Sequence, residues 1–380
     1  MAKSLGTQHH RMSLGQKFRR ITWGLVLVLT VTSLVGVAML YSAANGNFDP
    51  WASRQAMRYG AGLAMMIGIA LIDIRVLLSW SYGIYGVALA LLALVEVMGI
   101  SGMGAQRWID LGLFQLQPSE MMKVALVLAL ARYYHGLTLE DCRRFRTLVV
   151  PLLLVLAPAA LVLRQPDLGT AVMLMLTSAA LFLAAGIRLR IFAATAVAGL
   201  AAIPLAWQFL RDYQKERIYT FLDPERDPLG AGYHILQSKI ALGSGGVFGK
   251  GFLNGTQSHL SFLPERQTDF IFTMLAEEFG LVGGLALLAL YVLILIYGFV
   301  IGLGAKSQFA RLVATGVTAT FFIYVFINIA MVTGLIPVVG VPLPLVSYGG
   351  TAMVTIMIGI GLLMSVYVHR DINIPRRGNF

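Results

Sequence analysis

The chain has 380 residues, of which 58% are hydrophobic and only 12% are charged, and its mean hydropathy is +0.77. A soluble domain carries about 25% charged residues, so this composition excludes an ordinary soluble enzyme and a disordered protein. It also excludes a nucleic-acid binder despite the net charge of +11, because the basic excess is better interpreted as a signal of membrane topology. The single cysteine, Cys142, excludes a disulfide framework and a cysteine-based metal cluster.

Apolar segments of about 20 residues, the length that crosses a bilayer core, recur along the chain. The predicted spans are 21–41, 57–72, 80–99, 118–134, 147–163, 168–186, 191–209, 269–300, 311–333 and 351–369. The predicted fold is therefore an all-α polytopic membrane protein with about ten transmembrane helices. We expect residues 1–380 to form one membrane domain, with a long periplasmic loop at 210–268 between helices 7 and 8.

Lys and Arg residues predict the orientation of these spans, because short cytoplasmic loops are enriched in them. Basic residues cluster before the first span, which we interpret as an uncleaved anchor with its N-terminus inside. Ten spans return the C-terminus to the same side, so 1–20 and 370–380 are expected to be cytoplasmic tails. The short outer loops hold few basic residues, which are Arg54, Arg58, Arg107 and Arg164.

Two polar segments open helices on the predicted outer side. Gln117-Pro118-Ser119-Glu120 leads to Lys123, which shares a helix face with Glu120. Lys123 lies about one turn inside an apolar span, where a charge indicates function by default; a helix cap with a self-neutralising ion pair is the alternative. Arg164-Gln165-Pro166-Asp167 opens a later helix in the same way, and capping is again the alternative.

A third segment, 263–270, runs into an over-long span. Thr268 is expected to cap this helix and to place Asp269 in its first turn. The helix dipole would then hold the pKa of the Asp269 carboxyl down and keep it ionised, ready to accept a proton. Glu277 and Glu278 follow at about 80° and 180° around the helix from Asp269, so they do not both face one cavity.

Two further outer segments are rich in backbone-breaking residues. Residues 342–351 carry two prolines and a Gly-Gly pair, and irregular backbone at membrane depth commonly lines a binding cavity, so Ser347 is expected to contact the substrate. In the long loop, Lys239 and Lys250 flank the glycine-rich segment Gly243–Gly251. We expect that segment to move as a lid; a flexible linker or a rigid docking surface for a partner is the alternative. The pattern Tyr233, Leu236, Ile240 and Val247 predicts a short amphipathic helix.

These outer segments share a chemistry. No nucleotide-binding motif is present, so a substrate that reacts on this side must already be activated. Cations that can neutralise phosphate are Arg107, Lys123, Arg164, Lys239 and Lys250. Helix N-termini that face outward also favour anions. The residues therefore predict a membrane enzyme or transporter for an anionic, lipid-linked substrate at the outer leaflet.

Five ordered motifs resemble those of a known family. They are QPSE at 117–120, RQPDLGTA at 164–171, SGGVFGKG at 244–251, LPERQTDFIF at 263–272 and PLVSYGGT at 344–351. Together they cover nearly the whole chain and resemble the SEDS family (shape, elongation, division and sporulation). Arg266 and the short termini resemble the rod-shape members of that family more than the division members.

The resemblance implies a peptidoglycan glycosyltransferase of the bacterial cytoplasmic membrane, with its active site facing the periplasm. Such an enzyme joins lipid II units into glycan strands with inversion and releases undecaprenyl pyrophosphate. The family's essential aspartate corresponds to Asp269, and its other motif residues correspond to Glu120, Lys123, Arg164 and Asp167. The implied partners are a class B penicillin-binding protein, the MreC/MreD elongation machinery, lipid II, the nascent strand and membrane lipids, with no nucleic acid.

Two other functions stay open at this point: a lipid II flippase, and a non-catalytic scaffold that recruits the penicillin-binding protein. A flippase needs charged lining through the full depth of the bilayer, whereas the polar motifs here lie in the outer half. The sequence identifies no cofactor with certainty. A divalent cation (Mg or Mn) that assists pyrophosphate departure also stays open, although no group of carboxylates has diagnostic metal-ligand spacing.

Overall fold

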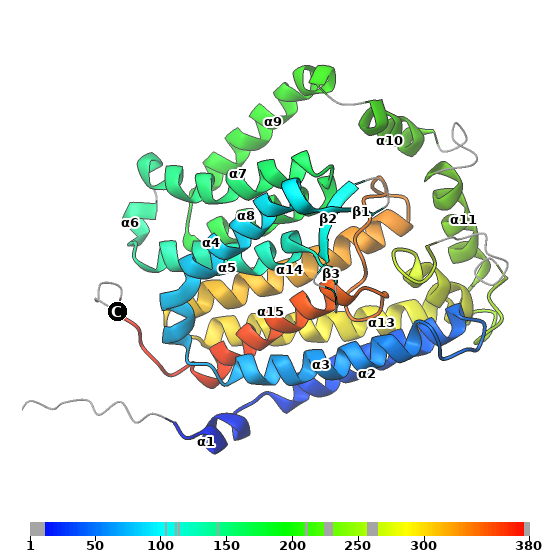
Figure 1. Ribbon diagram of the computed structural model, residues 1–380, viewed down its shortest axis with the longest axis horizontal. Coiled ribbons are helices and arrows are strands. Elements are labelled where there is room, and N and C mark those ends of the chain that lie inside the picture. Colours follow the sequence, from blue (N-terminus) through cyan, green and yellow to red (C-terminus); the bar gives the residue numbers. More distant parts are fainter. Residues whose placement is uncertain are drawn as a thin grey trace, which may run out of the picture.

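Long helices run side by side along the longest axis of the molecule (Figure 1). The structure is a computed structural model that describes residues 12–102, 105–110, 112, 115–142, 144–209, 212–223, 231–256 and 265–375. The helices are α1 (Leu14–Arg19), α2 (Trp23–Ala43), α3 (Ala52–Ala70), α4 (Ile74–Met98), α5 (Pro118–His135), α6 (Leu139–Cys142), η1 (Phe145–Leu148), α7 (Val149–Arg164), α8 (Leu168–Ala185), α9 (Leu189–Phe209), α10 (Asp212–Leu222), α11 (Ala231–Ser244), α13 (Ile271–Gly304), α14 (Gln308–Val332) and α15 (Gly350–Val368).

Every predicted span coincides with a helix, so the all-α polytopic class is confirmed. Within the described residues, seven helices are long and apolar enough to cross a membrane, namely α2, α4, α7, α8, α13, α14 and α15. Helix α5 carries Glu120, Lys123 and Arg132, and α9 contributes a shorter apolar stretch at Leu189–Ala202. The full number of about ten spans stays a prediction.

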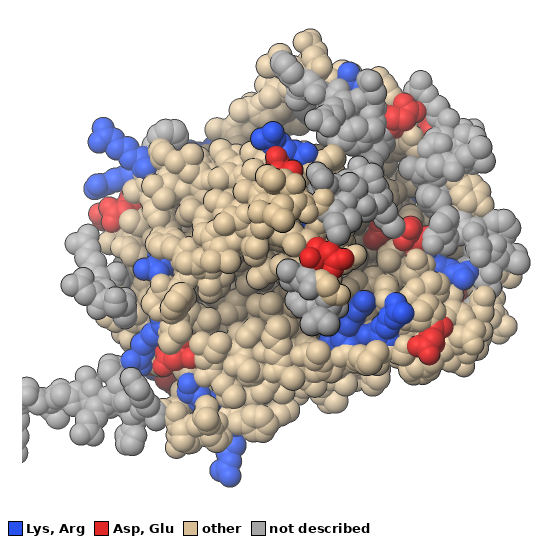
Figure 2. All heavy atoms as spheres, in the orientation of Figure 1, with Lys and Arg blue, Asp and Glu red and all other residues tan. Residues whose placement is uncertain are grey.

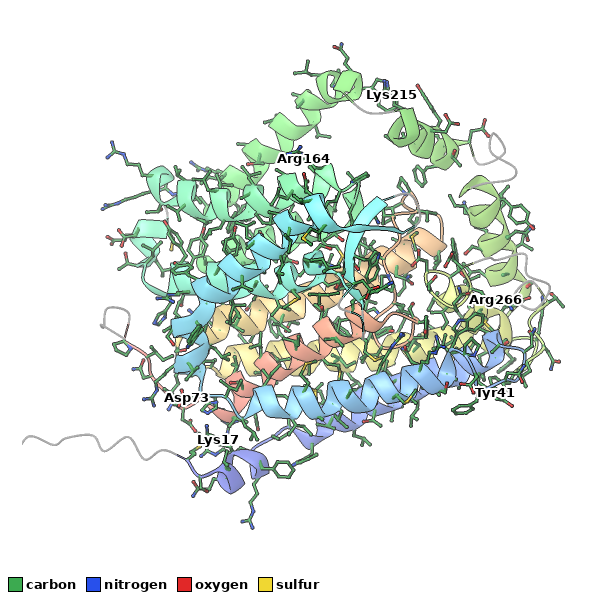
Figure 3. The ribbon with its side chains drawn as sticks, viewed as in Figure 1. Lys17, Tyr41, Asp73, Arg164, Lys215 and Arg266 are labelled. Atoms are coloured by element: carbon green, nitrogen blue, oxygen red, sulfur yellow. The ribbon has the colours of Figure 1, made fainter. Side chains whose placement is uncertain are left out.

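Charged residues separate the two ends of the bundle. Lys17 and Asp73 lie at the end that carries α1, and Tyr41, Lys215 and Arg266 lie towards the opposite end (Figure 3). On the face that Figure 2 shows, uncharged residues cover most of the surface, and the charged side chains form separate small groups. This distribution is what a bilayer demands of a spanning bundle.

Helices α14 and α15 form the centre of the bundle. They are the most buried of the candidate spans, and α14 packs against α5, α8, α13 and α15. Ser307 caps α14 by accepting a hydrogen bond from the Ala310 amide at 3.1 Å. Since every neighbour of α14 leads to one of the polar outer segments, α14 fixes how those segments meet.

A small antiparallel sheet, β1 (Ile100–Gly102), β2 (Ala105–Asp110) and β3 (Gln115–Leu116), departs from the all-α prediction. The Asp110 carboxylate accepts a hydrogen bond from the Gly112 amide at 2.7 Å, and Gly112 has a φ of +81°. Such a left-handed turn suits glycine and returns the chain from β2 to β3. The strands are too short to have given a clear alternating pattern in the sequence.

Helix α13 is interrupted at Gly280, where φ is +65° and ψ is −160°. The glycine-rich segment fills this break. Its backbone donates from Lys250 to Glu277 and from Gly251 to Glu278, at 3.1 and 3.0 Å. In return, the amides of Leu281 and Val282 donate to Gly246 and Val247 at 3.0 and 3.1 Å. These contacts argue against the predicted lid, because the segment is a strap hydrogen-bonded to α13.

The glycines of the strap allow its backbone to lie close against α13, and they do not indicate that the strap moves. A Cβ at Gly249 would lie 2.1 Å from the carbonyl oxygen of Glu278, and φ there is +78°. A Cβ at Gly245 would lie 2.1 Å from the carbonyl oxygen of Ala276. Any side chain at either position would push the strap away from the interrupted helix.

We therefore expect Gly249→Ala to lower the free energy of unfolding by about 2 kcal/mol or more, as strained backbone and a steric clash combine. Gly243→Ala is the matched control, because a Cβ at Gly243 meets no atom within 4 Å. Thermal unfolding of the purified protein in detergent measures both variants. Equal midpoints for the two variants would contradict the strap.

Candidate active site

The first polar cluster lies at the start of α5. Pro118 occupies the first turn, where a missing amide hydrogen does no harm. One turn on, Lys123 Nζ donates to Glu120 Oε1 at 2.6 Å and to the Tyr324 hydroxyl at 2.5 Å, and that hydroxyl also donates to Glu120 Oε2. All three side chains are buried. The predicted Glu120–Lys123 pair is present, and Tyr324 from α14 completes it.

The turn between α7 and α8 brings Arg107 and Asp167 together. The Asp167 carboxylate caps α8 by accepting from the Thr170 amide at 3.1 Å and from its hydroxyl at 2.9 Å. Arg107 of β2 donates to the carbonyl oxygens of Gln165 and Pro166, and its Nε lies 4.0 Å from Asp167 Oδ2. The small sheet thus delivers a guanidinium to this turn.

Asp269 lies in the turns that precede α13, and not in its first helical turn. The N-cap of α13 is Phe270, and Thr268 does not cap the helix, because its hydroxyl donates to Glu265 Oε2 at 2.7 Å. The side-chain amide of Asn328, on α14, donates from Nδ2 to the Asp269 carbonyl oxygen at 2.9 Å. The Asp269 carboxylate lies beside Gly340, where a Cβ would be 3.6 Å from Oδ2.

Helix α14 links these clusters. Tyr324 and Asn328 are four residues apart and share one face, so they are separated by about 6 Å along the helix axis. Tyr324 contacts Glu120 and Lys123, whereas Asn328 contacts the Asp269 backbone. The carboxylate of Asp167 also interacts electrostatically with Tyr324. The motifs of α5, the α7–α8 turn and the start of α13 therefore converge on one face of α14.

The pKa of the Asp269 carboxyl is raised to about 6, which corrects the expectation that a helix dipole would lower it. Burial is the larger cause, and the nearby Glu265 carboxylate adds to it. The physical reason for the difference is position: Asp269 lies ahead of the helix start in a half-buried turn. At neutral pH the group is largely ionised and is a stronger base than an ordinary aspartate.

The irregular segment around Ser347 holds the Asp269 turn in place. The Ser347 hydroxyl donates to the Thr268 carbonyl oxygen at 2.5 Å and accepts from the Leu343 amide at 2.7 Å. The Tyr348 amide donates to the Gln267 carbonyl oxygen at 2.8 Å. Because both sides of the Ser347 hydroxyl are engaged, this geometry favours a positioning role over the predicted substrate contact.

A cavity of about 710 Å³ opens beside these motifs. Glu120 lines it together with Arg58, Trp108 and Tyr348, and the Arg58 guanidinium lies 4.6 Å from the centre of the Tyr348 ring. From the sequence, Arg58 was expected only to signal topology, and Tyr324 and Asn328 carried no functional prediction. A cation at the second residue of the predicted span 57–72 was the available signal for Arg58; nothing in the sequence marked the tyrosine or the asparagine.

Three predicted phosphate ligands do not join this cluster. Arg164 is exposed and lies 3.6 Å from Glu96 at the end of α4. Lys250 donates to Glu277 at 2.8 Å and to Thr256, and therefore belongs to the strap. Lys239 lies across Gly334 just beyond α14, where a Cβ would meet its Cε at 2.3 Å. Their roles as substrate ligands stay predictions that these contacts do not favour.

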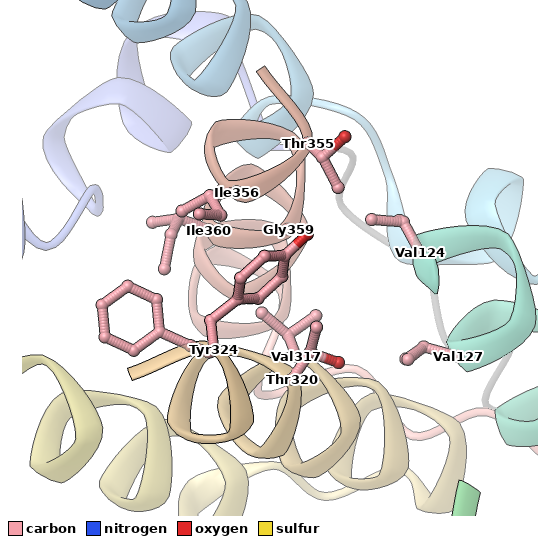
Figure 4. Close-up of a pocket in the computed structure, with 10 residues that line it drawn as sticks. Val124, Val127, Val317, Thr320, Tyr324, Thr355, Ile356, Gly359 and Ile360 are labelled. Atoms are coloured by element: carbon pink, nitrogen blue, oxygen red, sulfur yellow. The ribbon is translucent and has the colours of Figure 1, made fainter. Parts of the chain in front are cut away.

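Below the Lys123 cluster the interior is apolar. A void of only about 20 Å³ lies between α5, α14 and α15, and Figure 4 shows its lining of Val124, Val127, Val317 and Ile356 next to Tyr324. Among the described residues that line this void, none is charged. In the part of the chain that the structure describes, no group of three or more His, Cys, Asp or Glu side chains is arranged to hold a metal ion.

Comparison with known proteins agrees with this arrangement. Residues 17–372 match the family model of cell cycle proteins that covers FtsW, RodA and SpoVE. The chain is 45% identical over 347 residues to the Escherichia coli protein named peptidoglycan glycosyltransferase MrdB, covering 91% of this chain and 93% of that protein. A Helicobacter pylori protein of the same name is 39% identical, over 86% of this chain and 87% of that one.

Solved structures show the same fold. A chain from a structure described as a peptidoglycan synthase complex that coordinates polymerization and crosslinking superposes with a TM-score of 0.81 at 34% identity, covering 92% of this chain and 98% of that chain. The Thermus thermophilus rod shape determining protein RodA superposes at 0.70 and 30% identity, with the same coverage. With this match along nearly its whole length, the chain belongs to the FtsW, RodA and SpoVE family, which the ordered motifs indicated.

Proposed function

We propose that this chain polymerises lipid II into glycan strands at the outer face of the bacterial cytoplasmic membrane, for cell elongation, and releases undecaprenyl pyrophosphate. The chain is a peptidoglycan glycosyltransferase, as its relatives at 45% and 39% identity are named. One observation carries the proposed chemistry: a carboxyl group with a raised pKa, Asp269, is fixed by Asn328 on the face of α14 that also holds a buried lysine.

In the proposed reaction, Asp269 is the general base. It accepts the proton of the acceptor sugar's 4-hydroxyl while that oxygen bonds to the anomeric carbon of the donor. The bond from that carbon to the pyrophosphate oxygen breaks, and the pyrophosphate leaves with its negative charge. A single displacement inverts the anomeric centre and requires no covalent enzyme intermediate.

The cavity that Glu120, Arg58 and Trp108 line is the proposed site for the substrate headgroup. Two of the predicted phosphate ligands are connected to this cavity. Lys123 is paired with Glu120, which lines it, and Arg107 directly precedes Trp108, which also lines it. Their cationic groups stabilise the departing pyrophosphate electrostatically. A divalent cation (Mg or Mn) in the same role stays open.

The proposed topology has ten spans, with the three less apolar helices α3, α5 and α9 added to the seven candidate spans. One membrane domain then covers 1–380, with both tails cytoplasmic and the segment 210–268 periplasmic. The end that carries Asp269 faces the periplasm, where polymerisation takes place. The periplasmic end also offers the contact for a class B penicillin-binding protein, consistent with the synthase complex among the similar structures, and the MreC/MreD machinery is a further proposed partner.

A lipid II flippase is the second candidate, because ten helices and buried charge suit it as well. The apolar interior below Lys123 disfavours it, since a charged headgroup needs polar lining through the whole bilayer. The deciding experiment adds lipid II to the purified protein in detergent and resolves glycan length on a gel. Polymer formed without a membrane cannot result from flipping, and its absence in the presence of the partner would contradict the enzyme.

Asp269→Asn is expected to abolish polymerisation while the thermal midpoint changes little, because the backbone contact to Asn328 is kept. In the unaltered protein the rate should rise as pH rises through about 6, since the base works only when ionised. Glu265→Gln removes a carboxylate that raises the pKa of Asp269, so this acid limb should shift to lower pH. The general-base role of Asp269 is contradicted if the pH dependence of the rate does not shift in Glu265→Gln, or if Asp269→Asn makes normal polymer.

Lys123→Met and Glu120→Gln are each expected to lower the free energy of unfolding by about 3 kcal/mol or more, because each leaves one buried charge without its partner. The double variant should regain stability but not polymerisation, since Lys123 also stabilises the leaving group. Tyr324→Phe is the matched variant that keeps both charges and removes only the bridging hydroxyl. If the double variant polymerises normally, the pair has a purely structural role.

A further inference from the structure

At the end of the bundle opposite Asp269, the turn between α13 and α14 encloses a polar cavity of about 300 Å³. His135 of α5, Lys306, Gln308 and Arg311 line it together with the C-terminal segment 373–375. The turn is held against the end of α15, because the Lys306 amide donates to the Arg370 carbonyl oxygen at 3.2 Å. The cavity is thus lined by three separate parts of the chain.

The charge that lines this cavity is positive. Lys306 lies 3.7 Å from Asp371, which Arg20 also contacts at 3.2 Å, so one carboxylate is shared by two cations. Arg311 donates to the amide oxygen of Gln308, a neutral partner. The N-terminus of α14 adds its partial positive charge to the same place. An anion in this cavity would therefore meet uncompensated positive charge.

An apolar groove of about 530 Å³ runs along α13 and α14 from the same arginine. Its walls are exposed side chains, including Ile296, Phe299 and Phe322. Helices α13 and α14 approach closely at the bottom of the groove, because α13 carries glycine there. A Cβ at Gly298 would lie 2.2 Å from the Thr318 hydroxyl oxygen. The groove therefore presents a hydrocarbon-lined channel on the membrane-facing side of these helices.

Arg311 lines both the cationic cavity and the apolar groove. This juxtaposition has the layout of a phospholipid, with an anionic headgroup at the membrane surface and an acyl chain along the helices. We propose that the α13–α14 turn is a binding site for an anionic glycerophospholipid, with the phosphate between Arg311 and Lys306 and an acyl chain in the groove. The site is separate from the polymerisation site and serves to fasten this helix pair to its leaflet.

The probe is phosphatidylglycerol, presented to the full-length protein in detergent with an equal amount of phosphatidylcholine. Native mass spectrometry counts each lipid retained. Phosphatidylglycerol should be retained preferentially, and Arg311→Gln should reduce its affinity about five-fold without reducing that of phosphatidylcholine. Arg190→Gln, an exposed arginine at the start of α9, is the matched control and should change neither.

A second variant tests the groove. Ala319→Phe places a ring in the groove and should reduce retention of both lipids, whereas Ala90→Phe on the exposed side of α4 should not. Thermal midpoints of all variants verify that they fold. Equal retention of the two lipids by the unaltered protein, or an equal effect of Arg190→Gln, would overturn the proposal. Displacement of the lipid by glycerol 3-phosphate at the same concentration would show a soluble-anion site and would also overturn it.

Discussion

A lysine buried in an apolar bundle is the constraint on which the site depends. Removing an ammonium group from water is strongly unfavourable unless a carboxylate and further hydrogen bonds replace the water. Lys123 meets this requirement with Glu120 on its own helix and with Tyr324 from α14. Satisfying one charge thus fixes the rotation of α5 against α14.

The same face of α14 then organises the catalytic end. Asn328, one turn beyond Tyr324, donates to the backbone at Asp269 and at Val341, at 2.9 and 2.7 Å. Ser347 and Tyr348 bind the same turn from the other side. Irregular backbone near a membrane must have its polar groups hydrogen-bonded within the protein. The hydrogen bonds that satisfy this backbone therefore also fix the position of Asp269, the proposed base.

The sequence was most informative where hydrophobic length and charge acted alone. Helix bounds agree with the predicted spans within a few residues, and the Glu120–Lys123 pair followed from a three-residue spacing. Elsewhere, tertiary contacts produced structure that differs from what local sequence patterns predicted. Thr268 was expected to cap α13, yet its hydroxyl turns to Glu265, and the pKa of Asp269 is raised by burial that no local pattern displays.

The glycine-rich strap shows the same limit. Its composition suggested movement, because glycine lowers the cost of rearranging a backbone. The structure gives glycine a different use, since close approach to the interrupted α13 excludes side chains at Gly245 and Gly249, and φ is also positive at Gly249. Composition cannot separate these two uses, because the deciding contact lies about 30 residues away along the chain, at Ala276 and Glu278.

An apolar layer separates the proposed polymerisation site from the cationic cavity at the other end of the bundle. Lys123 and its partners stop at Val124, Val127 and Ile356, and the void beneath holds only about 20 Å³. The described residues that line this void give the proposed headgroup site beside Glu120 no charged continuation. This arrangement favours the proposed polymerisation at one end of the bundle, and the cationic cavity at Arg311 lies at the opposite end.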